Sequence, residues 1–226
     1  MKKGLILYGI GCTPIVWDEF QTYFGDFAVT YAAYPHEITQ AAHTVSGITK
    51  WVHARYGKER FDFIAGHSMG GIIALELAAR YHMDVGTIIL IEANLRPAGP
   101  FYRTLLLPAN APKYGDRLKT MFTEEAPYYT GELKASIQEG FDFSEYLFET
   151  NAAIFGVYGD RGVPDYAGRV GDLCLSRTAM ERIRFRFVKN SAHMPMIENP
   201  GELAAILRDC ISPQEPSAAG ECRSAF

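Results

Sequence analysis

The chain has 226 residues, of which 48% are hydrophobic and 21% are charged, with a formal net charge of −4. This composition is typical of a folded domain with a sizeable core, and it excludes an intrinsically disordered chain. The weakly negative charge gives no basic surface for a nucleic acid.

Targeting and metal-binding signals are also missing from the pattern. No apolar run approaches the roughly 18 residues of a membrane helix, and the short run after Lys3 has no cleavage site behind it. We therefore expect a cytoplasmic protein with no membrane span. The four cysteines are scattered, without the spacing of a metal site, so no metal and no cofactor are expected.

Strands and helices are predicted to alternate along most of the chain. Short apolar runs bounded by turn residues predict six strands, at 4–8, 27–34, 61–65, 87–91, 153–158 and 183–188. Helical spacing or helix-forming composition predicts the helices between them, at 14–24, 40–56, 70–81, 166–181 and 201–211. This order predicts an α/β fold with a doubly wound, mostly parallel sheet of about six strands.

The alternation stops between residues 95 and 150, a stretch rich in Pro, Gly, Tyr and Phe. We expect it to form a small helical lid inserted over one end of the sheet, with short helices around 114–122, 132–139 and 143–149. Residues 1–94 and 151–211 would then form the core. Residues 212–226, which contain two prolines among small and polar residues, would form a flexible tail.

The most informative motif is Gly66-His67-Ser68-Met69-Gly70-Gly71, which joins the strand predicted at 61–65 to the helix that follows. A serine on such a strand-to-helix turn has its Oγ exposed, and the flanking glycines remove side chains that would clash. The N-terminal N–H groups of the helix also point at the reacting oxygen. The context predicts Ser68 as a nucleophile, the alternative being an ordinary turn.

A serine hydroxyl needs a base to remove its proton. Among the six histidines, His193 follows the last predicted core strand, whereas four others fall in predicted loops or on helix faces. His67, which precedes the serine, is expected to shape the turn rather than to titrate. The sequence therefore predicts His193 as the base.

Both motifs resemble those of the α/β-hydrolase superfamily: residues 66–71 its nucleophile turn, and residues 191–200 (SAHMPMIENP) its histidine loop. The resemblance covers about residues 3–211 and implies a trimmed core that lacks the first two strands of larger members. It also implies an oxyanion hole formed by the backbone N–H groups of Ile10 and Met69. Tyr8 replaces the histidine that commonly begins that loop, without affecting these main-chain donors.

The acid that orients His193 has two candidates. The family commonly carries it in a Gly-x-x-Asp turn, but here Gly162 occupies the expected position and Asp160 lies two residues early. A subset of the family has the acid after the preceding strand, where this chain has Glu92. Glu92 is favoured over Asp160, since burying it at the end of an apolar run requires a partner. Glu92 could instead pair with Arg96, and Asp160 could simply cap a turn.

The aromatic residues of the 95–150 segment favour an apolar pocket, although they could merely pack the lid onto the sheet. These features predict a serine hydrolase, of the carboxylesterase or thioesterase kind, that cleaves a small apolar ester or thioester through an acyl-enzyme. The partner would be that small molecule, not a nucleic acid. The alternative is a non-catalytic or weakly catalytic small-molecule-binding protein on the same fold.

Overall fold

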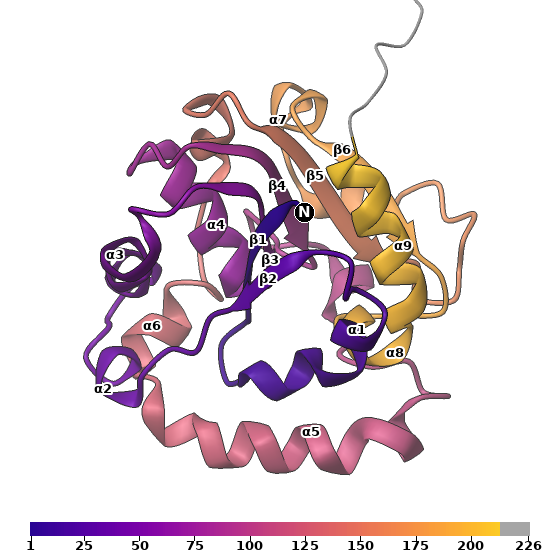
Figure 1. Ribbon diagram of the computed structural model, residues 1–226. Coiled ribbons are helices and arrows are strands. Elements are labelled where there is room, and N and C mark those ends of the chain that lie inside the picture. Colours follow the sequence, from indigo (N-terminus) through magenta and orange to yellow (C-terminus); the bar gives the residue numbers. More distant parts are fainter. Residues whose placement is uncertain (213–226) are drawn as a thin grey trace, which may run out of the picture.

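The computed structural model describes residues 1–212, so all but the first residue of the tail expected at 212–226 lies outside the described residues (Figure 1). Its centre is a six-stranded sheet in the order β2-β1-β3-β4-β5-β6, in which every neighbouring pair is parallel. The strands are β1 (Lys3–Leu7), β2 (Ala28–Tyr31), β3 (Phe61–His67), β4 (Val85–Ile91), β5 (Ala153–Gly159) and β6 (Arg184–Val188). The predicted parallel α/β fold is confirmed.

Helices cover both faces of this sheet. In Figure 1, α3 and α4 lie on one side of it, and α1 and α9 on the other. The helices are α1 (Asp18–Thr22), α2 (His36–Thr39), α3 (Val45–Tyr56), α4 (Met69–Ala79), α5 (Ala111–Glu125), α6 (Gly131–Ala135), α7 (Arg177–Glu181), α8 (Pro195–Glu198) and α9 (Pro200–Ile211). None of the helices within residues 1–212 is long and apolar enough to cross a membrane.

The helix predicted at 166–181 was wrong in extent. Only a short 3-10 turn at Gly171–Leu173 and α7 form there, separated by Cys174 in the left-handed region (φ 56°). Local side-chain bonds stabilise the broken path: the Tyr166 hydroxyl donates to Asp172, and Ser176 caps α7 by accepting from the Ala179 N–H. Ser and Asp favour such turns and caps over a continuous helix.

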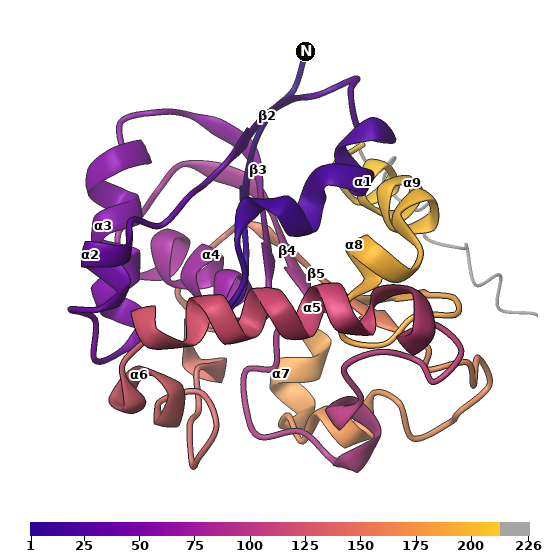
Figure 2. The same cartoon turned by 90° about the horizontal axis from the view of Figure 1, so that it is seen from below.

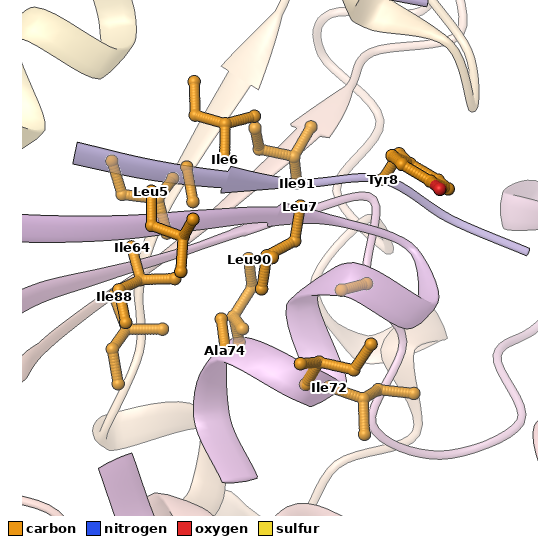
Figure 3. Packing of buried hydrophobic residues seen from close by; sticks show 14 of the residues in the cluster. Leu5, Ile6, Leu7, Tyr8, Ile64, Ile72, Ala74, Ile88, Leu90 and Ile91 are labelled. Atoms are coloured by element: carbon orange, nitrogen blue, oxygen red, sulfur yellow. The ribbon is translucent and has the colours of Figure 1, made fainter. Parts of the chain in front are cut away.

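The core lies on both faces of the central strands (Figure 3). Side chains alternate along β1, so Leu5 and Leu7 point toward α4 while Ile6 points to the opposite face. All three are fully buried. Every residue of α4 is buried as well, because that helix is enclosed by the sheet, by α3 and by the Ser144–Phe148 turn.

The carboxyl ends of all six strands meet at one edge of the sheet, and the chain reverses its direction of travel between β1 and β3. Ligands of open α/β sheets bind in the crevice at such a reversal. The insertion contributes α5 and α6, and α5 crosses in front of the sheet when the molecule is seen from below (Figure 2). Gly11, in the loop after β1, lies directly against Phe122 of α5, since a Cβ on Gly11 would be 3.0 Å from that ring.

Gly66 provides a test of the close contact between β3 and α4. A Cβ at this position would lie 2.1 Å from the Gly70 carbonyl oxygen, which belongs to the backbone and cannot move aside cheaply. We expect Gly66→Ala to lower the free energy of unfolding by roughly 1–3 kcal/mol.

The matched control is Gly115→Ala inside α5, where nothing lies within 4 Å of the added Cβ. This variant should gain about 0.5–1 kcal/mol, because alanine favours a helix interior over glycine. Urea denaturation followed by circular dichroism measures both. Equal midpoints for Gly66→Ala and the unmodified protein would contradict the packing described.

Candidate active site

Ser68 occupies a strained turn between β3 and α4. Its backbone has φ 51° and ψ −122°, outside the regions that non-glycine residues ordinarily adopt. The turn is held by two backbone bonds of 2.9 Å, from the Ser68 N–H to the Ile91 carbonyl and from the Gly71 N–H to the Ser68 carbonyl. Such strain in an over-determined turn is typical of a nucleophile elbow.

The loop after β1 lies against this serine. Leu7 pairs with Gly66 in the sheet, so the two loops leave the sheet side by side. A Cβ on Gly9 would be only 2.9 Å from the Ser68 Cβ, so a larger residue would push the loop away. The two expected oxyanion donors therefore belong to segments in contact: Ile10 follows Gly9, and Met69 is the first residue of α4, where helix N–H groups lack intrahelical partners.

Tyr8 fixes this loop from the core side. Its hydroxyl accepts a hydrogen bond from the Tyr34 N–H at 2.7 Å, and the two rings lie 4.3 Å apart. Burial, the largest cause, raises the pKa of Tyr8. The tyrosine that replaces the family's usual histidine thus anchors the loop through its side chain.

His193 is carried by the loop after β6, and several segments hold that loop in place. Its N–H donates to the Thr104 carbonyl at 3.3 Å, and its carbonyl lies 2.9 Å from His67 Nε2. Glu198 accepts the Ala192 N–H through one oxygen and the Leu107 N–H through the other. The histidine loop is therefore tied both to the end of β3 and to the inserted segment.

His67 is a buried, neutral member of this arrangement. Burial, with the neighbouring His193 adding to it, lowers the pKa of His67 to about 3. The rings of His67 and His193 are 4.8 Å apart, and His67 Nδ1 is buried without a partner. A neutral His67 donates to the His193 carbonyl, so the contacts agree with the structural role expected for it.

Glu92, directly after β4, places its carboxylate beside His193. The side chain is fully buried, with Oε2 at 3.4 Å from His193 Nδ1. It also accepts from the Gly159 N–H at 2.5 Å and from both terminal nitrogens of Arg161, each at 2.6 Å. Burial alone would raise the pKa of Glu92, but the bonds and charge of Arg161, with a contribution from His193, outweigh it and lower that pKa. The carboxylate is therefore held as an anion.

Asp160 performs a different task. One of its oxygens accepts the N–H groups of Gly162 and Asn190, each at 2.8 Å, and so joins the turn after β5 to the turn after β6. Arg96, the other partner considered for Glu92, instead pairs with Asp142 on the surface at 3.2 Å. Of the two candidate acids, Glu92 is the one in contact with His193.

Arg161 is the residue that the sequence did not single out. It follows Asp160 in the turn after β5, where its φ of 54° directs the chain through the left-handed region. The sequence carried only a weak signal for this partner. A buried glutamate needs a cation, but several arginines lie in the loops that follow the strands, and the sequence does not distinguish Arg161 among them.

Ser68, Glu92 and His193 line one partly open cavity of about 160 Å³. The other lining residues are Met69, Ile72, Asn94, Ile137 and Phe141. Ile137 and Phe141 come from the inserted segment, so this segment closes part of the cavity. Among residues 1–212, no group of three or more His, Cys, Asp or Glu side chains is placed to hold a metal ion.

Most aromatic residues of the insertion pack elsewhere. The Tyr102 ring lies 5.2 Å from Tyr158, and the Arg80 guanidinium lies 5.1 Å from the Tyr146 ring. Phe122 lines a separate, more open apolar hollow of about 510 Å³ beside α5. The expectation that these aromatics form a substrate pocket therefore applies, at the Ser68 cavity, to Phe141 alone.

Solved structures of similar fold include a bromoperoxidase from Bacillus anthracis (TM-score 0.71, 13% identity, 93% of this chain and 92% of that chain). A thioesterase domain from the curacin biosynthetic pathway has a TM-score of 0.65 at 14% identity, over 92% of this chain and 91% of that chain. Carboxylesterase CesB from Bacillus subtilis has a TM-score of 0.63 at 15% identity, over 93% of this chain and 83% of that chain. At such low identity these likenesses concern the fold.

A search among curated proteins found no match. The model of the alpha/beta hydrolase family, in contrast, matches residues 9–206, which is well over half of the chain. That range includes the serine turn, Glu92 and the histidine loop. The chain therefore belongs to the alpha/beta hydrolase family.

Proposed function

We propose that this protein is a serine hydrolase that cleaves short carboxylic esters or thioesters through an acyl-enzyme. One observation carries the proposal: the strained Ser68 shares a partly open cavity with His193, whose Nδ1 lies 3.4 Å from the buried Glu92 carboxylate. Nucleophile, base and orienting acid are the three roles that acyl transfer by serine requires.

The chemistry follows from these positions. Nε2 of His193 removes the Ser68 hydroxyl proton as Oγ attacks the substrate carbonyl carbon, and the N–H groups of Ile10 and Met69 stabilise the oxyanion. The same imidazole then gives the proton to the leaving alcohol or thiol, which departs and leaves an ester on Ser68. Water, deprotonated by His193, hydrolyses that ester and releases the acid. Glu92 accepts the Nδ1–H bond and stabilises the imidazolium in both steps.

The cavity limits the acyl group. Its volume of about 160 Å³ is below the roughly 300–1,000 Å³ of pockets that hold drug-sized ligands. Met69, Ile72, Ile137 and Phe141 supply an apolar lining. These features support a short, uncharged acyl chain, with residues 95–150 acting as the cap over it.

The first test separates catalysis from mere binding. Ser68→Ala should reduce hydrolysis of p-nitrophenyl acetate or butyrate by at least about 10³-fold, because the covalent route is lost. Ser212→Ala, at an exposed serine, should retain full activity. Equal turnover by Ser68→Ala and the unmodified protein would instead favour a binding protein on the hydrolase fold.

A second test assigns the acid. Glu92→Gln should lower kcat by about 10³–10⁴-fold, since an amide cannot stabilise the imidazolium. Asp160→Asn should change kcat by less than about tenfold, because its remaining carbonyl oxygen can still accept the two N–H groups. Circular dichroism verifies that both variants are folded. A large loss in Asp160→Asn with a small loss in Glu92→Gln would reverse the assignment.

A third test concerns acyl-chain length. Phe141→Ala should enlarge the cavity and shift the preferred p-nitrophenyl ester toward longer chains, measured as kcat/KM from acetate to decanoate. The control is Phe148→Ala, a phenylalanine of the same insertion that is 54% exposed and does not line the cavity. Identical chain-length profiles for Phe141→Ala and Phe148→Ala would exclude this cavity as the acyl site.

A further inference from the structure

We infer that Arg161 is a positioning residue that acts through Glu92: its charge and its two contacts hold the carboxylate as an anion beside His193, so that the pair need not keep a proton to neutralise it. The inference rests on the proposed function, because it concerns the base that activates Ser68. It assigns a task to a residue that does not itself line the cavity and contacts the site only through Glu92.

The contacts of Glu92 show that Arg161 is its principal partner. Each terminal nitrogen of the guanidinium is 2.6 Å from a different carboxylate oxygen, whereas His193 Nδ1 is 3.4 Å from Oε2. Paired, bidentate bonds of this kind fix the plane of a carboxylate as well as its charge. The orientation that Glu92 presents to His193 is therefore set by Arg161.

Arg161 is itself held rigidly from several sides. Its Nε donates to the Phe101 carbonyl at 3.2 Å and one terminal nitrogen donates to the Gly159 carbonyl at 2.7 Å. The guanidinium also lies 4.5 Å from the Tyr102 ring centre, where a cation is attracted to the aromatic face. With only 5% of its side chain exposed, Arg161 keeps this position without help from solvent.

Charged and titratable groups face the Glu92–His193 pair from several elements, among them the Tyr102 and Tyr158 hydroxyls, which stay neutral because burial raises their pKa. The Glu92 carboxylate lies against the ring, and Arg161 offsets its negative charge from the other side of the carboxylate. His67 faces the ring from the end of β3 and is neutral, because burial lowers its pKa to about 3. Glu198 of α8 is satisfied by the Ala192 and Leu107 N–H groups and lies near enough to Arg161 to interact with its charge. Arg161 is thus the cation that balances Glu92 when the imidazole is neutral.

Removing that cation changes the number of protons that the pair binds. In Arg161→Met the buried carboxylate loses its counterion, so either Glu92 or His193 must retain a proton to neutralise it. The apparent pKa then belongs to the coupled pair and rises whichever group carries the proton. The base becomes available only at higher pH.

The experiment is the pH profile of kcat/KM with p-nitrophenyl acetate, which reports the free enzyme. In Arg161→Met, the midpoint of the acid limb should move to higher pH by roughly 1–3 units, with activity lost at pH 7 and recovered on the alkaline side. Arg161→Lys, which keeps the charge but loses the two-pronged contact, should shift less. The control Arg96→Met removes a surface arginine–carboxylate pair, with 43% and 49% of the two side chains exposed, and should leave the midpoint unchanged.

The opposite results are equally defined. If kcat/KM of Arg161→Met falls at every pH while the midpoint of the acid limb is unchanged, Arg161 only supports the structure, and the inference is overturned. Should Arg161→Met not fold, Arg161→Gln, which removes the charge but keeps a hydrogen-bond donor for Glu92, decides by the same criterion of a shifted or unshifted midpoint.

A second measurement does not depend on turnover. NMR titration of the His193 ring in Ser68→Ala, with and without Arg161→Met, follows protonation directly, and the resonance is assigned by its loss in His193→Gln. A midpoint unaffected by Arg161→Met in both the titration and the pH profile would refute the role of Arg161. Absence of Ser68-dependent hydrolysis in the unmodified protein would refute the proposed function instead.

Discussion

The burial of one carboxylate constrains the whole carboxyl edge of the sheet. Glu92 directly follows β4, the strand between those that carry the serine turn and the Gly159–Arg161 turn, and it is cut off from solvent. An isolated buried anion costs several kcal/mol, so it persists only with charged and hydrogen-bonding partners. Here the partners are Gly159 and Arg161, at and just after the end of β5, and His193 in the loop after β6. These residues lie where they can bond and neutralise the Glu92 carboxylate.

The parallel sheet makes this convergence possible without long excursions of the chain. Each functional segment is the first loop residue or turn after a strand: residues 8–11 after β1, Ser68 after β3, Glu92 after β4 and Arg161 after β5. His193 follows β6, and two bonds attach its loop to the inserted segment: the His193 N–H donates to the Thr104 carbonyl, and the Leu107 N–H donates to Glu198. The insertion therefore has two effects on the site, since it fixes the histidine loop and closes the cavity with Ile137 and Phe141.

The fold and the serine turn could be predicted from the sequence because their signals are local. Apolar runs mark buried parallel strands, and Gly-x-Ser-x-Gly between a strand and a helix defines a turn regardless of the rest of the chain. The pairing of Glu92 with Arg161 could not be predicted from the sequence, because the two residues are 69 positions apart and are brought together by the left-handed backbone of Arg161 in the turn after β5. The helix prediction at 166–181 was wrong for a related reason. Side-chain bonds at single residues favour a turn and a cap there, and a pattern averaged over the whole segment does not reveal them.

The account is tested most directly by trapping the covalent intermediate that it requires. The protein is labelled with a fluorophosphonate, digested, and the modified peptide is identified by mass spectrometry. The account predicts a single adduct on Ser68, formed much more slowly in His193→Gln. An adduct on another residue such as Cys12, or undiminished ester hydrolysis without any adduct on Ser68, would contradict it.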